Sequence, residues 1–158
     1  MTAIAYKDGV MAADELLALD GAVDYCKTKA RKQNGFLIGV SGKRCPTDAQ
    51  FDTWFFQMAV NKKTKVERYA ALVLGNLPRM GNDKEFSFSA LVVDPNGKRY
   101  LVDESGGMEP VTTPYWAVGA GQDFCIGAMA AGASARDAVR IAIRHSSSCK
   151  GKVRSVEL

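Results

Sequence analysis

Two glycine-containing turns strongly restrict how this chain can fold. Lys7-Asp8-Gly9 and Gln33-Asn34-Gly35 each lie between stretches of apolar residues. Asp-Gly and Asn-Gly suit two-residue hairpin loops because these residue types tolerate a positive φ. The sequence therefore predicts two antiparallel hairpins, which join segment 2–6 to segment 9–14 and segment 24–33 to segment 36–42, with a loop near Asp20-Gly21 between them.

The segment after Pro46 has helical rather than strand periodicity. Thr47 or Asp48 can cap a helix here, because a short polar side chain accepts a hydrogen bond from an N–H of the first turn. Large apolar residues then recur at helical spacing, at Phe51, Trp54, Phe55, Met58 and Ala59. The pattern predicts a helix that packs on a core and ends within the basic stretch 61–65.

The remaining elements complete an α+β order. A loop is expected at 77–82, the turn Pro95-Asn96-Gly97 separates two strands, and a helix pair is split at Gly132, with Ser134 as cap. Further strands are predicted at 69–74, 86–94, 99–103, 115–118 and 153–156. This order favours two mainly antiparallel sheets packed face to face between layers of helices.

Length and composition fit one globular domain over residues 1–158. The 158 residues are 47% hydrophobic and 24% charged, which is close to ordinary globular usage. No apolar run reaches the roughly 20 residues of a membrane span, and the N-terminus lacks the basic-then-apolar order of a signal peptide. We expect no membrane association and a cytoplasmic protein.

Cysteine, histidine and glycine spacings predict neither a metal site nor a cofactor. The four cysteines, Cys26, Cys45, Cys125 and Cys149, show no C-x-x-C spacing, and His145 is the single histidine. A Ser-His-Asp triad could therefore use only this histidine as its base. The turn Gly119-Ala120-Gly121 lacks the third glycine of a dinucleotide-binding loop. No cofactor or metal is therefore expected.

The net charge of +4 comes from separate basic clusters. Such runs are typical of solvated strand edges and turns, and few aromatic residues are interleaved with them to stack on bases. Binding to nucleic acid is therefore not expected. The clusters comprise Lys27, Lys29, Arg31 and Lys32; Lys62, Lys63 and Lys65; and Lys150, Lys152 and Arg154.

Thr2 would become an N-terminal nucleophile if Met1 were removed. A free α-amine, with an unperturbed pKa of about 7.7–8.0, would then stand beside the hydroxyl that it must deprotonate. A small residue at position 2 is also common for reasons of processing. Thr2 alone therefore does not predict catalysis, which needs support from other residues of the chain.

Four stretches together resemble the proteasome β-subunit and HslV-type family of N-terminal nucleophile (Ntn) hydrolases, in particular its compact bacterial and phage members. Their order and spacing cover nearly the whole chain, and residues 60–85 match least. The stretches are Thr2–Tyr6 with Gly9–Asp14, Lys29 through Leu37–Gly42, Ala117–Gly121 with the helices that follow, and the closing strand. The resemblance implies a four-layer αββα sandwich, with Thr2 at a cleft between the sheets.

The resemblance also implies roles for individual residues. Thr2 would attack a carbonyl, and its own amine would accept the proton. Lys29 corresponds to the family lysine beside the nucleophile, whose charge disfavours protonation of that amine, and Asp14 would hold this lysine. Lys27, two residues earlier and so on the same strand face, is the competing assignment. The backbone N–H of Gly39 corresponds to the oxyanion donor.

Two supporting positions depart from the family pattern. Ala120 stands where relatives have a serine that helps to relay the proton, so that a water must replace the hydroxyl or turnover is impaired. Ser148 resembles a second supporting serine, but His145 occupies the place of the acidic residue expected before it. The rival interpretation is therefore a catalytically silent subunit of the same fold, with Met1 retained.

The resemblance further implies partners. The substrate would be a peptide or a related amide, and relatives form closed rings of six or seven subunits, so we expect a homo-oligomer. The sequence contains no nucleotide-binding motif, and unfolding of large substrates would need a separate ATPase.

Overall fold

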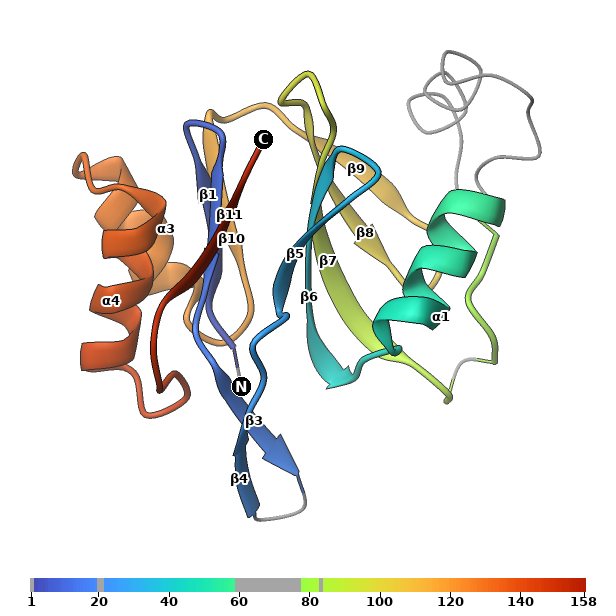
Figure 1. The fold of residues 1–158 in the computed structure, drawn as a ribbon, viewed down its shortest axis with the longest axis horizontal. Coiled ribbons are helices and arrows are strands. Elements are labelled where there is room, and N and C mark those ends of the chain that lie inside the picture. Colours follow the sequence, from blue (N-terminus) through green and yellow to red (C-terminus); the bar gives the residue numbers. More distant parts are fainter. Residues whose placement is uncertain (1, 20–21, 59–77, 83) are drawn as a thin grey trace.

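The computed structural model describes residues 2–19, 22–58, 78–82 and 84–158. Four layers follow one another across the molecule (Figure 1). Helices α3 (Gln122–Ala130) and α4 (Ala135–His145) form one outer layer, two sheets follow, and helix α1 (Asp48–Asp52) lies on the far side. The expected α+β sandwich is confirmed.

The first sheet is antiparallel throughout and holds both ends of the described chain. Its strand order is β10-β1-β2-β11, with Ile4–Lys7 as β1, Val10–Ala13 as β2, Tyr115–Val118 as β10 and Arg154–Glu157 as β11. The predicted turn between β1 and β2 is confirmed, because Asp8 and Gly9 both have positive φ, of 51° and 79°.

Among the residues that the structure describes, the second sheet contains five strands in sequential order. They are β5 (Ala30–Gln33), β6 (Phe36–Arg44), β7 (Ser87–Val93), β8 (Arg99–Asp103) and β9 (Met108–Val111). Asn34 and Gly35 form the predicted hairpin turn, with φ values of 52° and 81°. The sequence did not predict β9, an edge strand that contains Pro110, a residue that weakens the strand pattern.

The prediction of one strand over 24–33 is wrong. Strand β3 (Leu16–Leu19) pairs with β4 (Ala22–Tyr25) in a separate hairpin, and only β5 joins the second sheet. Residues 26–29 belong to neither strand. The strand is interrupted because β4 forms a hairpin with the preceding strand, β3, whereas β5 forms a hairpin with the following strand, β6.

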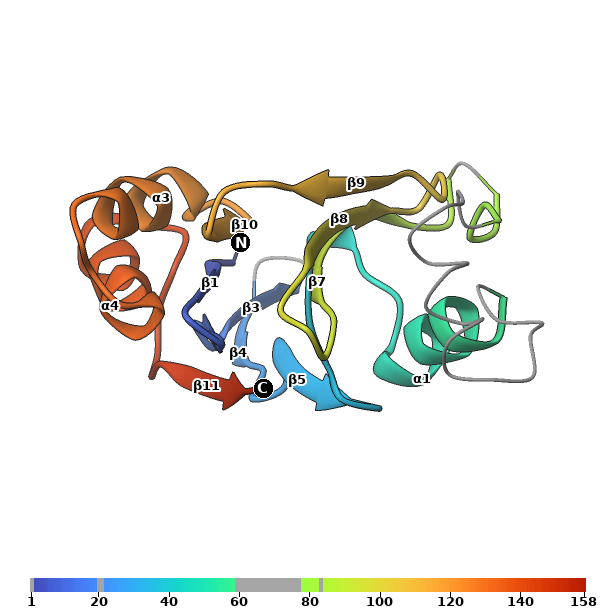
Figure 2. The ribbon, with the colours of Figure 1, turned by 90° about the horizontal axis from the view of Figure 1, so that it is seen from above.

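Each of the three interfaces between layers has its own apolar cluster, because successive strand side chains point to opposite faces. In β1, Ala5 faces the helices α3 and α4, whereas Ile4 faces the second sheet. In β7, Leu91 faces the first sheet, whereas Phe88 packs towards α1. Figure 2 shows the same succession of layers from above.

The predicted helix after Pro46 is confirmed at its start and in its buried face. Thr47 caps α1 in a capping box with Gln50, and Phe51, Trp54 and Phe55 are buried. The chain continues as a π-helix over Thr53–Met58. Residues 78–82 of the predicted loop carry no helix or strand. Ala59, the stretch 61–65 and the predicted strand at 69–74 lie outside the described residues.

Ser134 caps α4, as predicted, and accepts a hydrogen bond from the N–H of Asp137. Helices α3 and α4 pack on the first sheet through small residues, among them Ala138, Ala142 and Cys125. None of the helices in the described part of the chain combines the length and apolar character needed to cross a bilayer.

Candidate active site around Thr2

Thr2 lies two residues before β1 and is held by its backbone. Its carbonyl oxygen accepts a hydrogen bond of 3.0 Å from the N–H of Gly121. Gly119, with φ of +96°, lies so close that a Cβ on it would fall 2.3 Å from the same oxygen. Only glycine suits this conformation and contact. Thr2 itself is 7% exposed.

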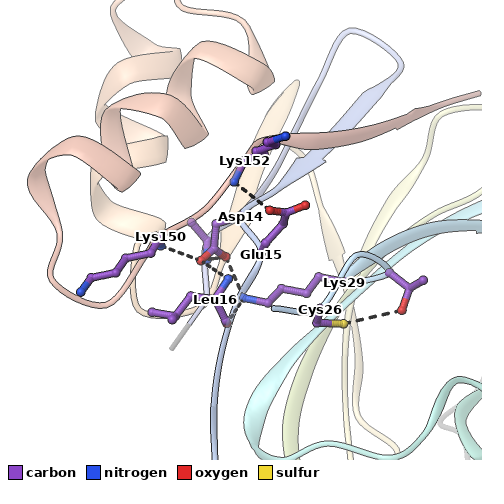
Figure 3. Close-up of polar contacts among 9 residues, drawn as sticks. Asp14, Glu15, Leu16, Cys26, Lys29, Lys150 and Lys152 are labelled. Carbon is purple, nitrogen blue, oxygen red and sulfur yellow. Dashed lines mark hydrogen bonds and ion pairs between the residues drawn. The ribbon is translucent and has the colours of Figure 1, made fainter. Parts of the chain in front are cut away.

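Asp14 lies fully buried beside Thr2 and accepts four hydrogen bonds. Its Oδ1 accepts from the Nζ of Lys29 at 2.9 Å and from the N–H of Ala3 at 2.9 Å. Its Oδ2 accepts from the N–H groups of Leu16 and Lys150, both at 3.2 Å. Figure 3 shows how Asp14, Lys29, Leu16 and Lys150 converge. A buried carboxylate needs such a complete set of donors.

Lys29, and not Lys27, pairs with Asp14. Lys29 is buried and also donates to the carbonyl oxygen of Leu16, whereas Lys27 is exposed. Both residues lie near the break between β4 and β5, and neither is part of a strand, so the expected shared strand face does not exist. The interpretation of this basic cluster as a solvated edge is also wrong for Lys29.

A cavity of about 560 Å³ is lined by Thr2 and Lys29. Arg31 contributes to its wall, makes ion pairs with Asp48 and Asp52, and stacks on the ring of Phe51. Because both carboxylates and the ring are engaged with Arg31, its guanidinium is fixed in the wall.

Two thiols, Cys26 and Cys45, lie in the same wall. Although Cys45 is an exposed residue, desolvation of its thiol raises the pKa, while the nearby charge of Lys29 works in the opposite direction. A raised pKa favours the neutral thiol, which is a poor nucleophile. Cys45 therefore lacks the lowered pKa that marks a reactive thiol.

Gly39 does not line this cavity. A Cβ on Gly39 would fall 2.6 Å from Cγ2 of Ile4 and 3.1 Å from Sδ of Met11, so the glycine allows the two sheets to approach each other. Gly42, near the end of β6, lines the cavity together with Thr2. Gly39 and Gly42 are three residues apart in β6, so their Cα–H faces point to opposite sides of the sheet.

Ala120 lines a second cavity, of about 680 Å³, on the other side of the Gly119 turn. Ser41 also lines it, from β6, and its Oγ lies 2.9 Å from the position that a Cβ of Gly119 would take. Ser41 is 9% exposed. Sequence reasoning missed this residue, because a serine inside an apolar strand has no distinguishing pattern.

His145 is the last residue of α4, and Ser148 follows in the segment after this helix. The backbone N–H of Ser148 donates to Oγ of Ser146, and His145 is exposed and stacks on Phe124. Neither residue lines either of the two cavities described above. The structure therefore brings together Thr2, Asp14 and Lys29, with Ala120 across the Gly119 turn, but not Gly39, Ser148 or His145.

Metal-ligating side chains do not gather at the site. Within the described ranges, no group of three or more His, Cys, Asp or Glu side chains is arranged to hold a metal ion. The polar groups near Thr2 are the Lys29 ammonium group paired with the Asp14 carboxylate, and the backbone N–H of Gly121, which donates to the Thr2 carbonyl oxygen.

Comparison with known proteins relates the chain to solved structures by fold. No family model and no curated protein matches the sequence. The BPH protein of Thiobacillus denitrificans in complex with epoxomicin matches with a TM-score of 0.63 and 18% identity, over 99% of this chain and 97% of that one. BPH in a second structure gives a TM-score of 0.62 and 20% identity, over 99% and 96%.

Eukaryotic HslV from Trypanosoma brucei matches with a TM-score of 0.66 and 19% identity, and the match covers 99% of both chains. At such identities the likeness concerns the fold. The chain therefore has the HslV-like, proteasome-type Ntn-hydrolase fold.

Proposed function

We propose that this protein is a threonine-type N-terminal nucleophile hydrolase that cleaves peptide or related amide bonds. The observation that carries the proposal is the buried pair of Asp14 and Lys29 beside Thr2, at the wall of a cavity that Thr2 and Lys29 share. Removal of Met1, which lies outside the described residues, would free the amine of Thr2 to act as a base.

The charges explain why such an amine would work near neutral pH. Asp14 holds the ammonium group of Lys29 in place, and a fixed positive charge disfavours a second one on a nearby amine. The Thr2 hydroxyl would attack the carbonyl carbon while its proton passes to the α-amine. That proton would then go to the leaving amine as the C–N bond breaks, and water would hydrolyse the ester left on Thr2. The oxyanion would be bound by a backbone N–H of β6. Gly39 is the candidate from the family resemblance, and Gly42, which lines the cavity, is a second candidate.

A second function is favoured by Ala120. The methyl group cannot donate or accept the hydrogen bond of the serine that the family resemblance leads us to expect there. A catalytically silent subunit that serves in assembly or interaction would tolerate this loss. The two functions differ in one measurable property, which is the reactivity of Thr2.

The deciding experiment is the intact mass of natively produced protein before and after incubation with epoxomicin, the compound bound to BPH. The proposed hydrolase loses Met1 and gains one adduct, which is absent from the Thr2→Ala variant. Retained Met1 and no adduct would reject the hydrolase and favour the silent subunit. Thr2→Ser is the matched control, because it keeps a hydroxyl at the same position and should still form the adduct.

We further infer a cytoplasmic homo-oligomer, in the form of a ring, that depends on a separate ATPase for folded substrates. The HslV-like fold supports this inference. Light scattering of the native protein tests it: a mass of a single chain at micromolar concentration would contradict the ring.

A further inference from the structure

The segment between α4 and β11 contributes to the site through its backbone alone. Lys150 donates its backbone N–H to Oδ2 of Asp14 at 3.2 Å, while its side chain points away from Asp14 (Figure 3). The position of this N–H therefore depends on how residues 150–152 are held. This segment is 136 residues away from Asp14 in the sequence.

Glu15 holds this segment from both sides. Its backbone N–H donates to the carbonyl oxygen of Lys150 at 3.1 Å, and its Oε2 accepts from the N–H of Lys152 at 2.9 Å. Its Oε1 accepts from Nε of Arg154 at the start of β11, at 2.5 Å. The Glu15 side chain is only 8% exposed. Figure 3 shows Glu15 next to Asp14 and reaching towards Lys152.

Gly151 shows how closely the segment fits on Glu15. It has φ of +89°, and a Cβ there would fall 2.9 Å from the Cβ of Glu15. The N–H of Lys152 and the guanidinium of Arg154 also hold the pKa of Glu15 below its usual range. Glu15 is therefore an ionised side chain at neutral pH, and it binds the residues on either side of a tightly fitted glycine.

We propose that Glu15 is a positioning residue, which sets the Lys150 N–H on Asp14 and thereby fixes the Asp14–Lys29 pair beside Thr2. This rests on the proposed function of Thr2. Glu15 does not line the cavity that contains Thr2, so it would act through Asp14 and not on a substrate. Without its carboxylate, Asp14 keeps fewer fixed donors, and the ammonium group of Lys29 is less well placed.

The test compares Glu15→Gln with Glu157→Gln. The amide that replaces the Glu15 carboxylate has one acceptor oxygen and an NH2 donor in place of the second oxygen. Either the Lys152 N–H or the Arg154 Nε–H therefore faces a donor instead of an acceptor. Glu157→Gln changes the carboxylate of a different ion pair, in which Glu157 of β11 binds Arg136. This pair makes no contact with Asp14 among the described hydrogen bonds. The first measurement is the rate of epoxomicin adduct formation against pH. The second is hydrogen exchange of the backbone amides of Ala3 and Lys150, both of which bond to Asp14.

Glu15→Gln should slow adduct formation by about tenfold, within the range known for residues that orient metal ligands. The pH of half-maximal rate should move upwards, because a less fixed Lys29 charge leaves the Thr2 amine protonated to higher pH. Exchange at Lys150 should become faster. Glu157→Gln should leave the rate and its pH dependence unchanged within about twofold, as expected for an exposed ion pair.

The proposal is overturned if Glu15→Gln matches Glu157→Gln in the pH of half-maximal rate and in exchange at Lys150. If Glu15→Gln does not fold, Arg154→Met replaces it, because this variant removes one of the two side-chain contacts of Glu15. The pH dependence of adduct formation and the exchange at Lys150 are then measured for Arg154→Met, and a match with Glu157→Gln in both overturns the proposal. If the wild-type protein forms no adduct, the proposed function of Thr2 fails. Exchange at Lys150 then still decides whether Glu15 positions that N–H.

Discussion

Thr2 has two differently built polar sides. On one side, Asp14 is buried and accepts from Ala3, Leu16, Lys29 and Lys150, which come from separate parts of the chain. On the other side, the backbone of Gly119 and Gly121 holds Thr2, and Ala120 adds only a methyl group.

This difference separates two requirements of the proposed chemistry. The Asp14 side fixes a positive charge, which tunes the amine, and its many hydrogen bonds make that charge hard to displace. The Ala120 side would handle proton movement, and it has fewer fixed side-chain groups. Changes on the first side should therefore affect both stability and reaction, whereas changes on the second should mainly affect reaction.

The largest effect is expected for Lys29→Met. It leaves the buried carboxylate of Asp14 without its ammonium partner, which should lower the free energy of unfolding by about 3–5 kcal/mol. The matched control is Lys27→Met, at an exposed lysine two residues away, with a change of no more than about 0.5 kcal/mol. Urea unfolding measures both. Equal losses in the two variants would contradict the buried pair.

Gly119→Ala should have the next largest effect. The residue has φ of +96° and no room beside the Thr2 carbonyl. Gly132→Ala is the control, since Gly132 has φ of +102° but nothing within 4 Å of the position of a Cβ. Both variants carry about 1–3 kcal/mol of backbone strain. Gly119→Ala should lower the free energy of unfolding more than Gly132→Ala, and only Gly119→Ala should slow epoxomicin adduct formation. Equal losses of stability and equal adduct rates in the two variants would show that the contact between Gly119 and Thr2 is unimportant.

The sequence was informative where the structure depends on neighbouring residues. The hairpin turns at Asp8-Gly9 and Asn34-Gly35 and the Thr47 cap follow from the residue types themselves. Asp14 and Lys29 were assigned from the family resemblance, which left Lys27 as a competing lysine, and the structure pairs Lys29 with Asp14.

Contacts made by the backbone could not be predicted in this way. The N–H of Lys150 reaches Asp14 across 136 residues, and nothing in its side chain marks that contact. The side of the sheet to which each residue of a strand points was also difficult to predict. Gly39 and Gly42 lie three residues apart in β6, and only the packing of Ile4 against Gly39 shows which one serves the contact between the sheets.

Ala120→Ser adds to the Ala120 side the hydroxyl that it lacks. Ala120 is exposed in its cavity, so the hydroxyl can enter without displacing a packed group. A hydrogen bond to a charged amine contributes about 1.5–3 kcal/mol, and the adduct rate should rise by about tenfold or more. Ala130→Ser, at an exposed alanine at the other end of α3, should change nothing. An unchanged rate in Ala120→Ser would mean that this side already has a working proton path.

Ser41→Ala should have the smallest effect and shows what the Ala120 side already contains. The Ser41 hydroxyl approaches the Gly119 turn from the opposite sheet and is nearly buried. Removal of this nearly buried hydroxyl is expected to cost no more than one neutral hydrogen bond contributes, about 1 kcal/mol, which corresponds to an adduct rate about fivefold lower. Ser89, the cross-strand neighbour of Ser41, lines the same cavity but is exposed, so Ser89→Ala is the control and should leave the rate unchanged. If Ser41→Ala is also silent, the Gly119 turn positions Thr2 by its backbone alone, and the two sides of Thr2 differ even more than the geometry indicates.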